Sequence, residues 1–421
     1  MKKHKIIAIS ATCIVVIVAI FAGLFYQGFF FYSTVKGQPM AIDTNATAES
    51  VDSLVDAMND FSFEMYKKLY SNSDENVFFS PYSIFVALAM TYEGAHGETA
   101  EEMYNVLHFP QDNDTMLCSF GRIYNLLNID KEYTLNTANA LWIQENYPFL
   151  QEYLSFIENY YMGKATEVDF SNAEQTAQLI NQWVEENTNG KIKDLLTSGD
   201  IHPLTRLILT NAIYFKGIWK YQFDPESTVE KDFEISPENT VKVPMMSFSE
   251  SSVELSYTET DDLQILELPY TGDKLSMMIL LPKENDISNV ENMINYENLS
   301  HWRNSLTKTA VQVLLPKFKL ETEYQLKNYL MDMGMQVPFT MDADFSGMTG
   351  HQELFIEKVI HKAFIEVNEE GTEAAGATSV HMVLKSVPDV IEFNADHPFI
   401  LLIQHGETGN ILFMGKVCNP Q

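Results

Sequence analysis

The sequence predicts an α+β fold with mainly antiparallel β-sheets. Apolar residues with helical spacing dominate the first half of the body, long strand patterns fill the second half, and the two do not alternate as βαβ units. No internal repeat, low-complexity block or Pro/Gly-rich linker divides residues 51–421. We therefore expect one large domain there, although a length of 421 residues alone would suggest two or three.

The amino terminus predicts a membrane anchor. Residues 1–5 are basic, residues 6–26 form an uncharged apolar run, and a group of aromatic residues follows. As a helix the run would span roughly 31 Å, which matches the apolar core of a bilayer. We expect an uncleaved transmembrane signal-anchor with residues 1–5 in the cytoplasm, a tether over 27–50 and an extracellular body. Cleavage of a signal peptide after Ala22, which would give a secreted protein, is the alternative.

The charge balance excludes some classes of partner. The chain has 58 Asp and Glu against 27 Lys and Arg, for a net charge of −31, and the acids are spread along it. Nucleic acids and heparin require a positive surface, and no Lys/Arg-rich helix of the heparin-binding type is present, so neither is expected as a partner. The three cysteines, Cys13, Cys118 and Cys418, are too few for a disulfide framework.

Helices are expected mainly in the first half of the body. Apolar residues at helical spacing predict a helix over 51–70. Thr99 with Glu102, and Ser171 with Glu174, have the spacing of capping boxes that begin helices. The second of these helices should end at Asn189-Gly190.

Strands are expected mainly afterwards. The patterns predict strands over 206–219, 263–270, 275–281 and 354–367, and a final hairpin of 399–404 with 411–417. One capped helix is expected in this half, near 322–333.

The sequence lacks the usual signatures of an enzyme. It has no G-x-S-x-G elbow, no H-E-x-x-H, no phosphate-binding Gly loop and no C-x-x-C, and its ten His residues lack metal-ligand spacing. Residues 342–353 match several positions of a calcium loop, but a turn with Asx-type hydrogen bonds explains them better. We expect no catalytic residue, no metal and no cofactor.

The segment 369–379 has an unusual composition. It follows a strong strand pattern, contains no Pro and is rich in small residues. A flexible linker would have this composition. However, alternate residues from Thr372 to Met382 are small or apolar and could form the inward face of a strand.

The sequence resembles the serpin family over roughly residues 51–420. The motifs that carry the resemblance occur in family order: the segments 76–84, 209–219, 343–348, 360–363, 369–377, 393–399 and 413–417. The resemblance implies one domain with three mainly antiparallel sheets, about eight or nine helices and an exposed reactive-centre loop over about 369–392. It also gives 342–353 a structural explanation, because Ala-Asp-Phe-Ser-Gly-Met belongs to the general serpin pattern.

The resemblance implies an inhibitory site rather than a catalytic one. A target serine protease would attack the loop at Lys385-Ser386, sixteen residues after Glu369, and form a covalent acyl-enzyme complex. A shift in register would move this bond to Leu384 or Val383. The hinge that starts the insertion of the cleaved loop would comprise Glu369, Gly371, Thr372, Glu373, Ala374, Ala375, Gly376 and Ala377.

Five further positions match structural motifs of the family. Ser80, Ser83, Asn211 and His361 match the shutter beneath the opening sheet, and Trp219 matches the breach where insertion begins. His361 is expected to be buried and neutral.

Two functions remain open. The first is an inhibitory serpin, monomeric and directed at trypsin-like proteases, because its hinge has no Pro and no charge at inward positions. The second is a non-inhibitory serpin fold that binds or stores another molecule. A hydrolase has no supporting motif.

Overall fold

The computed structural model describes residues 40–70, 75–110, 115–128, 132–250, 252–372 and 390–421. Residues 41–421 form one compact unit. No helix in these ranges is long and apolar enough to cross a membrane. The expected anchor at 6–26 lies outside the described residues.

Ten α-helices occur in the described ranges, one or two more than expected. They are α2 (Ala48–Tyr70), α3 (Pro81–Tyr92), α4 (Gly97–Val106), α5 (Met116–Asn128), α6 (Gln151–Tyr160), α7 (Ala173–Asn187), α8 (Ile287–Met293), α9 (Tyr296–Ser305), α10 (Lys327–Met333) and α11 (Ser346–Thr349). Three short 3₁₀ helices accompany them: η1 (Ser198–Asp200), η2 (Pro225–Ser227) and η3 (Val337–Phe339).

The strands form a ten-stranded and a six-stranded sheet. The larger contains β1 (Val77–Phe79), β5 (Val229–Ser236), β6 (Asn239–Ser247), β7 (Val253–Glu259), β8 (Leu263–Pro269), β9 (Leu275–Pro282), β10 (Thr307–Pro316), β14 (Ile391–Asn394), β15 (Phe399–His405) and β16 (Ile411–Val417). The smaller has the order β11 (Phe318–Gln325), β12 (Ile356–Val367), β13 (Gly371–Thr372), β4 (Leu207–Ile218), β2 (Tyr133–Gln144) and β3 (Lys164–Val168).

The expected count of three sheets is therefore wrong, because β10 joins two of them. Its first residues, Thr307–Val311, pair with β7, whereas Leu314–Pro316 pair with β6. One long strand thus belongs to two antiparallel layers, and the hydrogen bonds run without a break from β1 to β5. The α+β class and the predominance of antiparallel pairing agree with the prediction.

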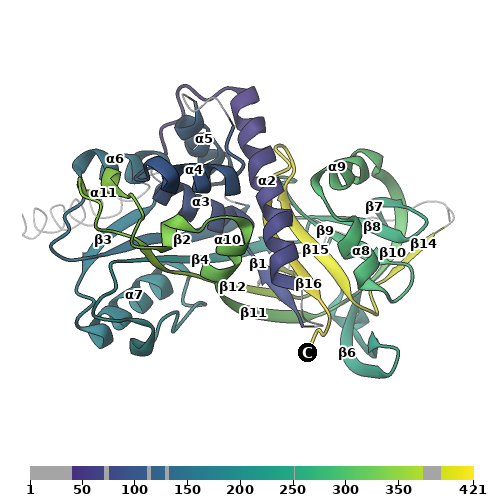
Figure 1. Ribbon diagram of the computed structural model, residues 1–421. Helices are drawn as coiled ribbons and strands as arrows, with labels where there is room; N and C mark the ends of the chain where they lie inside the picture. The colour runs from purple at the N-terminus through teal and green to yellow at the C-terminus, as the bar shows by residue number, and fades with distance from the viewer. Residues whose placement is uncertain (1–39, 71–74, 111–114, 129–131, 251, 373–389) are drawn as a thin grey trace, which may run out of the picture. The chain divides into compact units, whose positions relative to one another are not determined.

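Helices cover both faces of the six-stranded sheet. In Figure 1, α7 lies on the other side of β2 and β4 from α3, α4 and α5. Alternate residues of β4 face these two layers: Ile208 and Ala212 pack in the cluster under α7, whereas Leu209 and Ile213 belong to the main core. Because successive side chains of a strand point to opposite faces, β4 carries apolar residues on both of its faces.

The structure confirms the long elements predicted from periodicity. The helix expected over 51–70 is α2, and the expected strands correspond to β4, β8, β9, β12, β15 and β16. The expected stop after α7 is also present: Asn189 and Gly190 have φ values of 54° and 74°, and Gly190 N–H donates to Glu185 O.

The expected helix over 322–333 is wrong in its first half. Thr322 lies in β11, where it pairs with Ala363 of β12, and α10 begins only at Lys327. Side chains of β11 alternate between inward and outward positions. Pairing with the neighbouring strand therefore overrides the local capping signal.

Both expected capping boxes are also wrong. Helix α4 begins after His96, and Thr99 Oγ1 instead accepts a hydrogen bond from Asp344 N–H at 2.8 Å. Glu102 accepts from Gln336 and Val337 N–H, both at 2.6 Å, so these side chains satisfy the backbone of a distant segment. Helix α7 begins after Asn172, and no side-chain hydrogen bond caps it.

Candidate functional site

The candidate site is the point where the chain leaves β12 and turns back into the six-stranded sheet. Strands β4 and β12 pair directly in parallel from Leu207 and Ile356 to Ile213 and Ala363. Beyond that point the two strands separate, and β13 lies between them. Thr372 pairs with Val367 of β12 and with Gly217 of β4.

The turn before β13 is held by its own polar groups. Asn368 Oδ1 accepts hydrogen bonds from the N–H groups of Glu370 at 3.0 Å and Gly371 at 3.2 Å. A Cβ atom on Gly371 would lie 2.1 Å from Gly217 O. Glycine is required here because β13 approaches the backbone of β4 too closely for any side chain.

Two aromatic residues, Trp219 and Tyr270, hold β13 and the turn before it in place. The indole N–H of Trp219 donates to Asn368 O at 3.0 Å, and its ring stacks on Tyr270 with centroids 4.5 Å apart. The hydroxyl groups of Tyr270 and Thr372 are hydrogen-bonded at 2.6 Å. Thr372 is 1% exposed, so this small side chain already occupies an inward position of the sheet.

Glu369 anchors the outer side of the same turn. Its carboxylate forms an ion pair with Lys317 at 2.9 Å and accepts a hydrogen bond from Thr228 Oγ1 at 2.8 Å. Burial by itself would raise the pKa of Glu369, but the hydrogen bonds and the charge of Lys317 outweigh it, and the pKa is lowered. Glu369 is thus held as a carboxylate.

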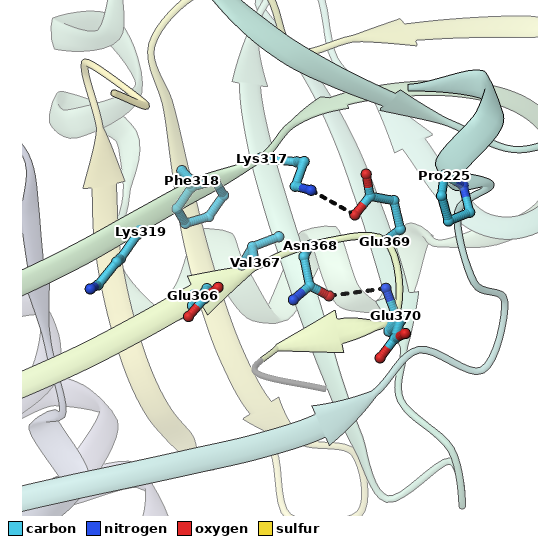
Figure 2. Close-up of a pocket in the computed structure, with 9 residues that line it drawn as sticks. All are labelled: Pro225, Lys317, Phe318, Lys319, Glu366, Val367, Asn368, Glu369 and Glu370. Atoms are coloured by element: carbon cyan, nitrogen blue, oxygen red, sulfur yellow. Dashed lines mark hydrogen bonds and ion pairs between the residues drawn. The ribbon is translucent and has the colours of Figure 1, made fainter. Parts of the chain in front are cut away.

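An open cleft of about 460 Å³ borders this turn. Figure 2 shows Glu366, Asn368, Glu369 and Glu370 around it, with Lys317 directed at Glu369. The remaining lining residues are Pro225, Phe318, Lys319 and Val367. On this side the turn before β13 therefore borders open space rather than a packed core.

A buried polar cluster lies in the part of the sheet where β4 and β12 pair directly with each other. The residues are Ser80, Ser83, Asn139, Asn211 and His361, and each is at most 5% exposed. Asn211 and His361 are direct cross-strand partners, and their side chains are hydrogen-bonded to each other. Asn211 also donates to Ser83 and to Asn139.

The hydrogen bonds of His361 define its protonation. Its Nε2 accepts from Ser80 N–H at 3.0 Å, so Nε2 carries no proton and Nδ1 donates to Asn211 Oδ1. Burial lowers the pKa of His361 to about 3, and the bond to Asn211 opposes this only in part. The expected neutral, buried His361 agrees with this geometry.

The structure brings the predicted positions together in two groups. The first group lies around β13 and consists of Glu369, Gly371, Thr372 and Trp219. The second group lies at the directly paired part of β4 and β12 and consists of Ser80, Ser83, Asn211 and His361. The other predicted hinge residues and the predicted bond lie outside the described residues: Glu373, Ala374, Ala375, Gly376, Ala377, Lys385 and Ser386.

Four residues of these two groups were not among the residues predicted from the sequence. Asn139, Tyr270, Lys317 and Thr228 make direct hydrogen bonds or ion pairs within them. Asn139 lies in β2, a strand that was not predicted, just before its apolar residues 140–143. The other three come close to the hinge only through the fold.

The segment 342–353 forms a turn at Asp344 and the short helix α11. Asp344 accepts from Ser346 N–H at 3.0 Å, and its other oxygen is hydrogen-bonded to Gln352. Among the residues that the structure describes, no three His, Cys, Asp or Glu side chains are grouped to hold a metal ion.

Comparisons with known proteins give a consistent result. A family model described as serpin (serine protease inhibitor) matches residues 56–420. An uncharacterised serpin-like protein of Thermococcus kodakarensis is 46% identical over 376 residues, which cover 87% of this chain and 86% of the relative.

Solved structures agree with the sequence relatives. Serpin48 of the insect Tenebrio molitor, described as a highly specific serpin, superposes with a TM-score of 0.82 at 33% identity, covering 89% of this chain and all of the insect chain. Human thyroxine-binding globulin in complex with thyroxine gives a TM-score of 0.81 at 32% identity, covering 88% of this chain and all of the globulin. This chain is thus similar both to a protein described as a highly specific serpin and to a thyroxine-binding one.

Proposed function

Because this chain belongs to the serpin family, we propose that it is an inhibitory serpin, a suicide substrate of extracellular serine proteases. The observation that carries this proposal is β13. A two-residue strand, continuous with the loop, already lies between β4 and β12 at the end of the sheet where a longer insertion would begin.

The surroundings of β13 support an insertion that continues between β4 and β12. Next to β13 these two strands are parallel, so a strand antiparallel to both would have hydrogen-bonding partners on both sides. The loop residues that would follow at inward positions are Ala374, Gly376 and Thr378, which are small and uncharged. They would enter the sheet without burying a charge.

The proposed chemistry is that of an arrested acyl transfer. The protease serine would attack the carbonyl carbon of Lys385, the bond to Ser386 would break, and Ser386 would leave with a new amino group. Insertion of about fifteen loop residues at roughly 3.3 Å each would carry the ester-linked protease about 50 Å. The serpin would be consumed in one event and would not turn over.

The specificity proposal rests on Lys385. A Lys side chain before the cleaved bond fits a protease pocket that has an Asp at its base, as trypsin-like enzymes have. Cleavage after Leu384 or Val383 would instead favour proteases with apolar pockets.

The second candidate is a non-inhibitory binding protein. The likeness to thyroxine-binding globulin supports it. The hinge composition counts against it, since neither Pro nor a charged inward residue interrupts 371–379.

We further propose a monomer that is anchored outside the cell by residues 6–26, or secreted if this segment is removed. The support comes from the basic start and the uncharged apolar run of the sequence.

The test is incubation of the full chain with trypsin, followed by denaturing electrophoresis. We expect a band of the summed mass, and we expect Lys385→Ala to abolish it while leaving the heat stability nearly unchanged. Lys242→Ala, at an exposed lysine of β6 outside the proposed loop, is the matched lysine control and should retain the complex. Cleavage after Lys385 without a complex would refute inhibition, and a persistent complex with Lys385→Ala would refute only the bond assignment.

A further inference from the structure

The loop returns to the body through β14, a strand of four residues. Its pairing partner within the described residues is β10, with Ile391 opposite Val311 and Asn394 opposite Leu314. Gln264 of β8 adds a hydrogen bond to Glu392 O at 2.9 Å. Such a short strand at a sheet margin depends on the turn that follows it.

This turn is built around His397, whose side chain is 14% exposed. Its Nδ1 lies 2.8 Å from Asp396 Oδ1, and its Nε2 lies 2.8 Å from the carbonyl oxygen of Pro282, the last residue of β9. Both partners are acceptors only. A neutral imidazole can donate through one nitrogen, so only the protonated ring satisfies both contacts.

The turn also connects to other strands. Asp396 Oδ2 accepts from Asn394 Nδ2 at 2.7 Å, and Asp396 O accepts from Glu234 N–H of β5 at 2.7 Å. His397 thus joins the end of β14 to β9, and Asp396 joins it to β5. Loss of one imidazole donor would loosen the connection to Asp396 or the one to Pro282.

The charges around His397 favour the protonated ring. Asp396 and Glu234 are the acids that face it, and Lys283, the residue after β9, is paired with Glu259 at 3.3 Å. Burial would lower the pKa of His397, but its two hydrogen bonds and these two carboxylates outweigh burial, and the pKa is raised.

We propose that His397, in its imidazolium form, is a positioning residue that fixes β14 and hence the carboxy-terminal end of the reactive loop in a pH-dependent manner. The functional part of this inference rests on the proposed inhibitory role. The structural part, retention of β14, does not.

The sign of the effect follows from proton linkage. A histidine whose pKa is raised on folding contributes stability that is complete below its unfolded pKa of about 6.5 and is lost as pH rises through the folded value. Retention of β14 should therefore weaken from near-neutral to alkaline pH.

The test is hydrogen–deuterium exchange of the full chain between pH 6 and pH 9, corrected for the intrinsic pH dependence of exchange. We expect the protection of residues 391–395 to fall severalfold as His397 loses its proton. His397→Gln should give low protection that no longer changes with pH. Asp396→Asn, which removes the facing charge, should move the loss of protection to lower pH.

Two controls make the outcome decisive. His351→Gln, at an exposed histidine, should keep the wild-type profile, and exchange of β16 should show that every variant remains folded. An unchanged pH profile in His397→Gln, or a flat profile in the wild type, would overturn the proposal. No protease is present, so failure here is separate from a failure to form the covalent complex.

Discussion

At the scale of single residues, Glu93 shows how the fold alters an ordinary side chain. It caps the carboxy-terminal end of α3, and its carboxyl group accepts a hydrogen bond from Tyr161 OH at 2.5 Å. Burial raises the pKa of Glu93 to about 7, and the bond from Tyr161 opposes this only in part. The partial negative charge at the end of a helix also disfavours a carboxylate there.

Glu93→Gln should therefore stabilise the protein at pH 8 but not at pH 5. A raised carboxyl pKa gives stability that is complete below the unfolded value of about 4.5 and is lost as pH rises through 7. The gain at pH 8 should be roughly 3 kcal/mol in urea unfolding, by the relation of about 1.4 kcal/mol per pKa unit. Glu98→Gln, at an exposed position of α4, is the control. Equal effects of Glu93→Gln at both pH values would contradict this assignment.

At the scale of elements, β13 depends on what lies beside it. Two residues cannot form a stable strand alone, but Gly371 and Thr372 have β4 on one side and β12 on the other. The hydroxyl of Tyr270 and the indole N–H of Trp219 complete the hydrogen bonds of this segment and of the turn before it. The strand thus exists because the surrounding sheet already has a place for it.

Under the proposed inhibitory function, Thr372→Arg should make the chain a substrate of the protease. Thr372 is 1% exposed, so a guanidinium at this inward position would cost several kcal/mol to bury, and β13 should leave the sheet. The number of serpin molecules consumed per inhibited protease should rise severalfold, with cleaved serpin replacing the complex on denaturing gels. Thr372→Ser keeps the hydroxyl bonded to Tyr270 and should inhibit normally. An unchanged ratio with Arg would count against insertion through β13.

At the scale of the whole molecule, the packed body begins at Ala41. Ala41 exchanges two hydrogen bonds with the side chain of Asn125, both at 2.9 Å, and Ile42 N–H donates to Asn159 O at 2.8 Å. The backbone is therefore fixed to α5 and α6 already at residues 41–42, and α2 begins at Ala48, so the second part of the expected tether over 27–50 belongs to the packed body.

Removal of residues 1–39 should leave the unfolding midpoint unchanged and move the protein from the membrane fraction to the soluble fraction. Removal of residues 1–43 should also destabilise it, by about 1–3 kcal/mol, since the buried amide of Asn125 loses both partners. Urea unfolding and membrane fractionation check the two effects separately. A full-length chain that is already soluble would refute the anchor without affecting the stability argument.

The sequence by itself determined the features that are written in local patterns. These are the α+β class, the long helix α2, the strands β4, β8, β9, β12, β15 and β16, and, through motif order, the residues that meet at the hinge and beneath it. Only the tertiary structure decided features that depend on distant partners. Thr322 became a strand residue through β12, and Thr99 and Glu102 became caps for remote backbone. Likewise, β10 joins two sheets because it pairs with both β6 and β7. Asn139, Tyr270 and His397 find their hydrogen-bond partners Asn211, Thr372 and Asp396 only in the folded chain. The physical reason is that the partner of a hydrogen bond or of a buried side chain can come from any part of the chain that lies nearby in the folded structure. Sequence periodicity shows only which face of its own helix or strand a residue occupies.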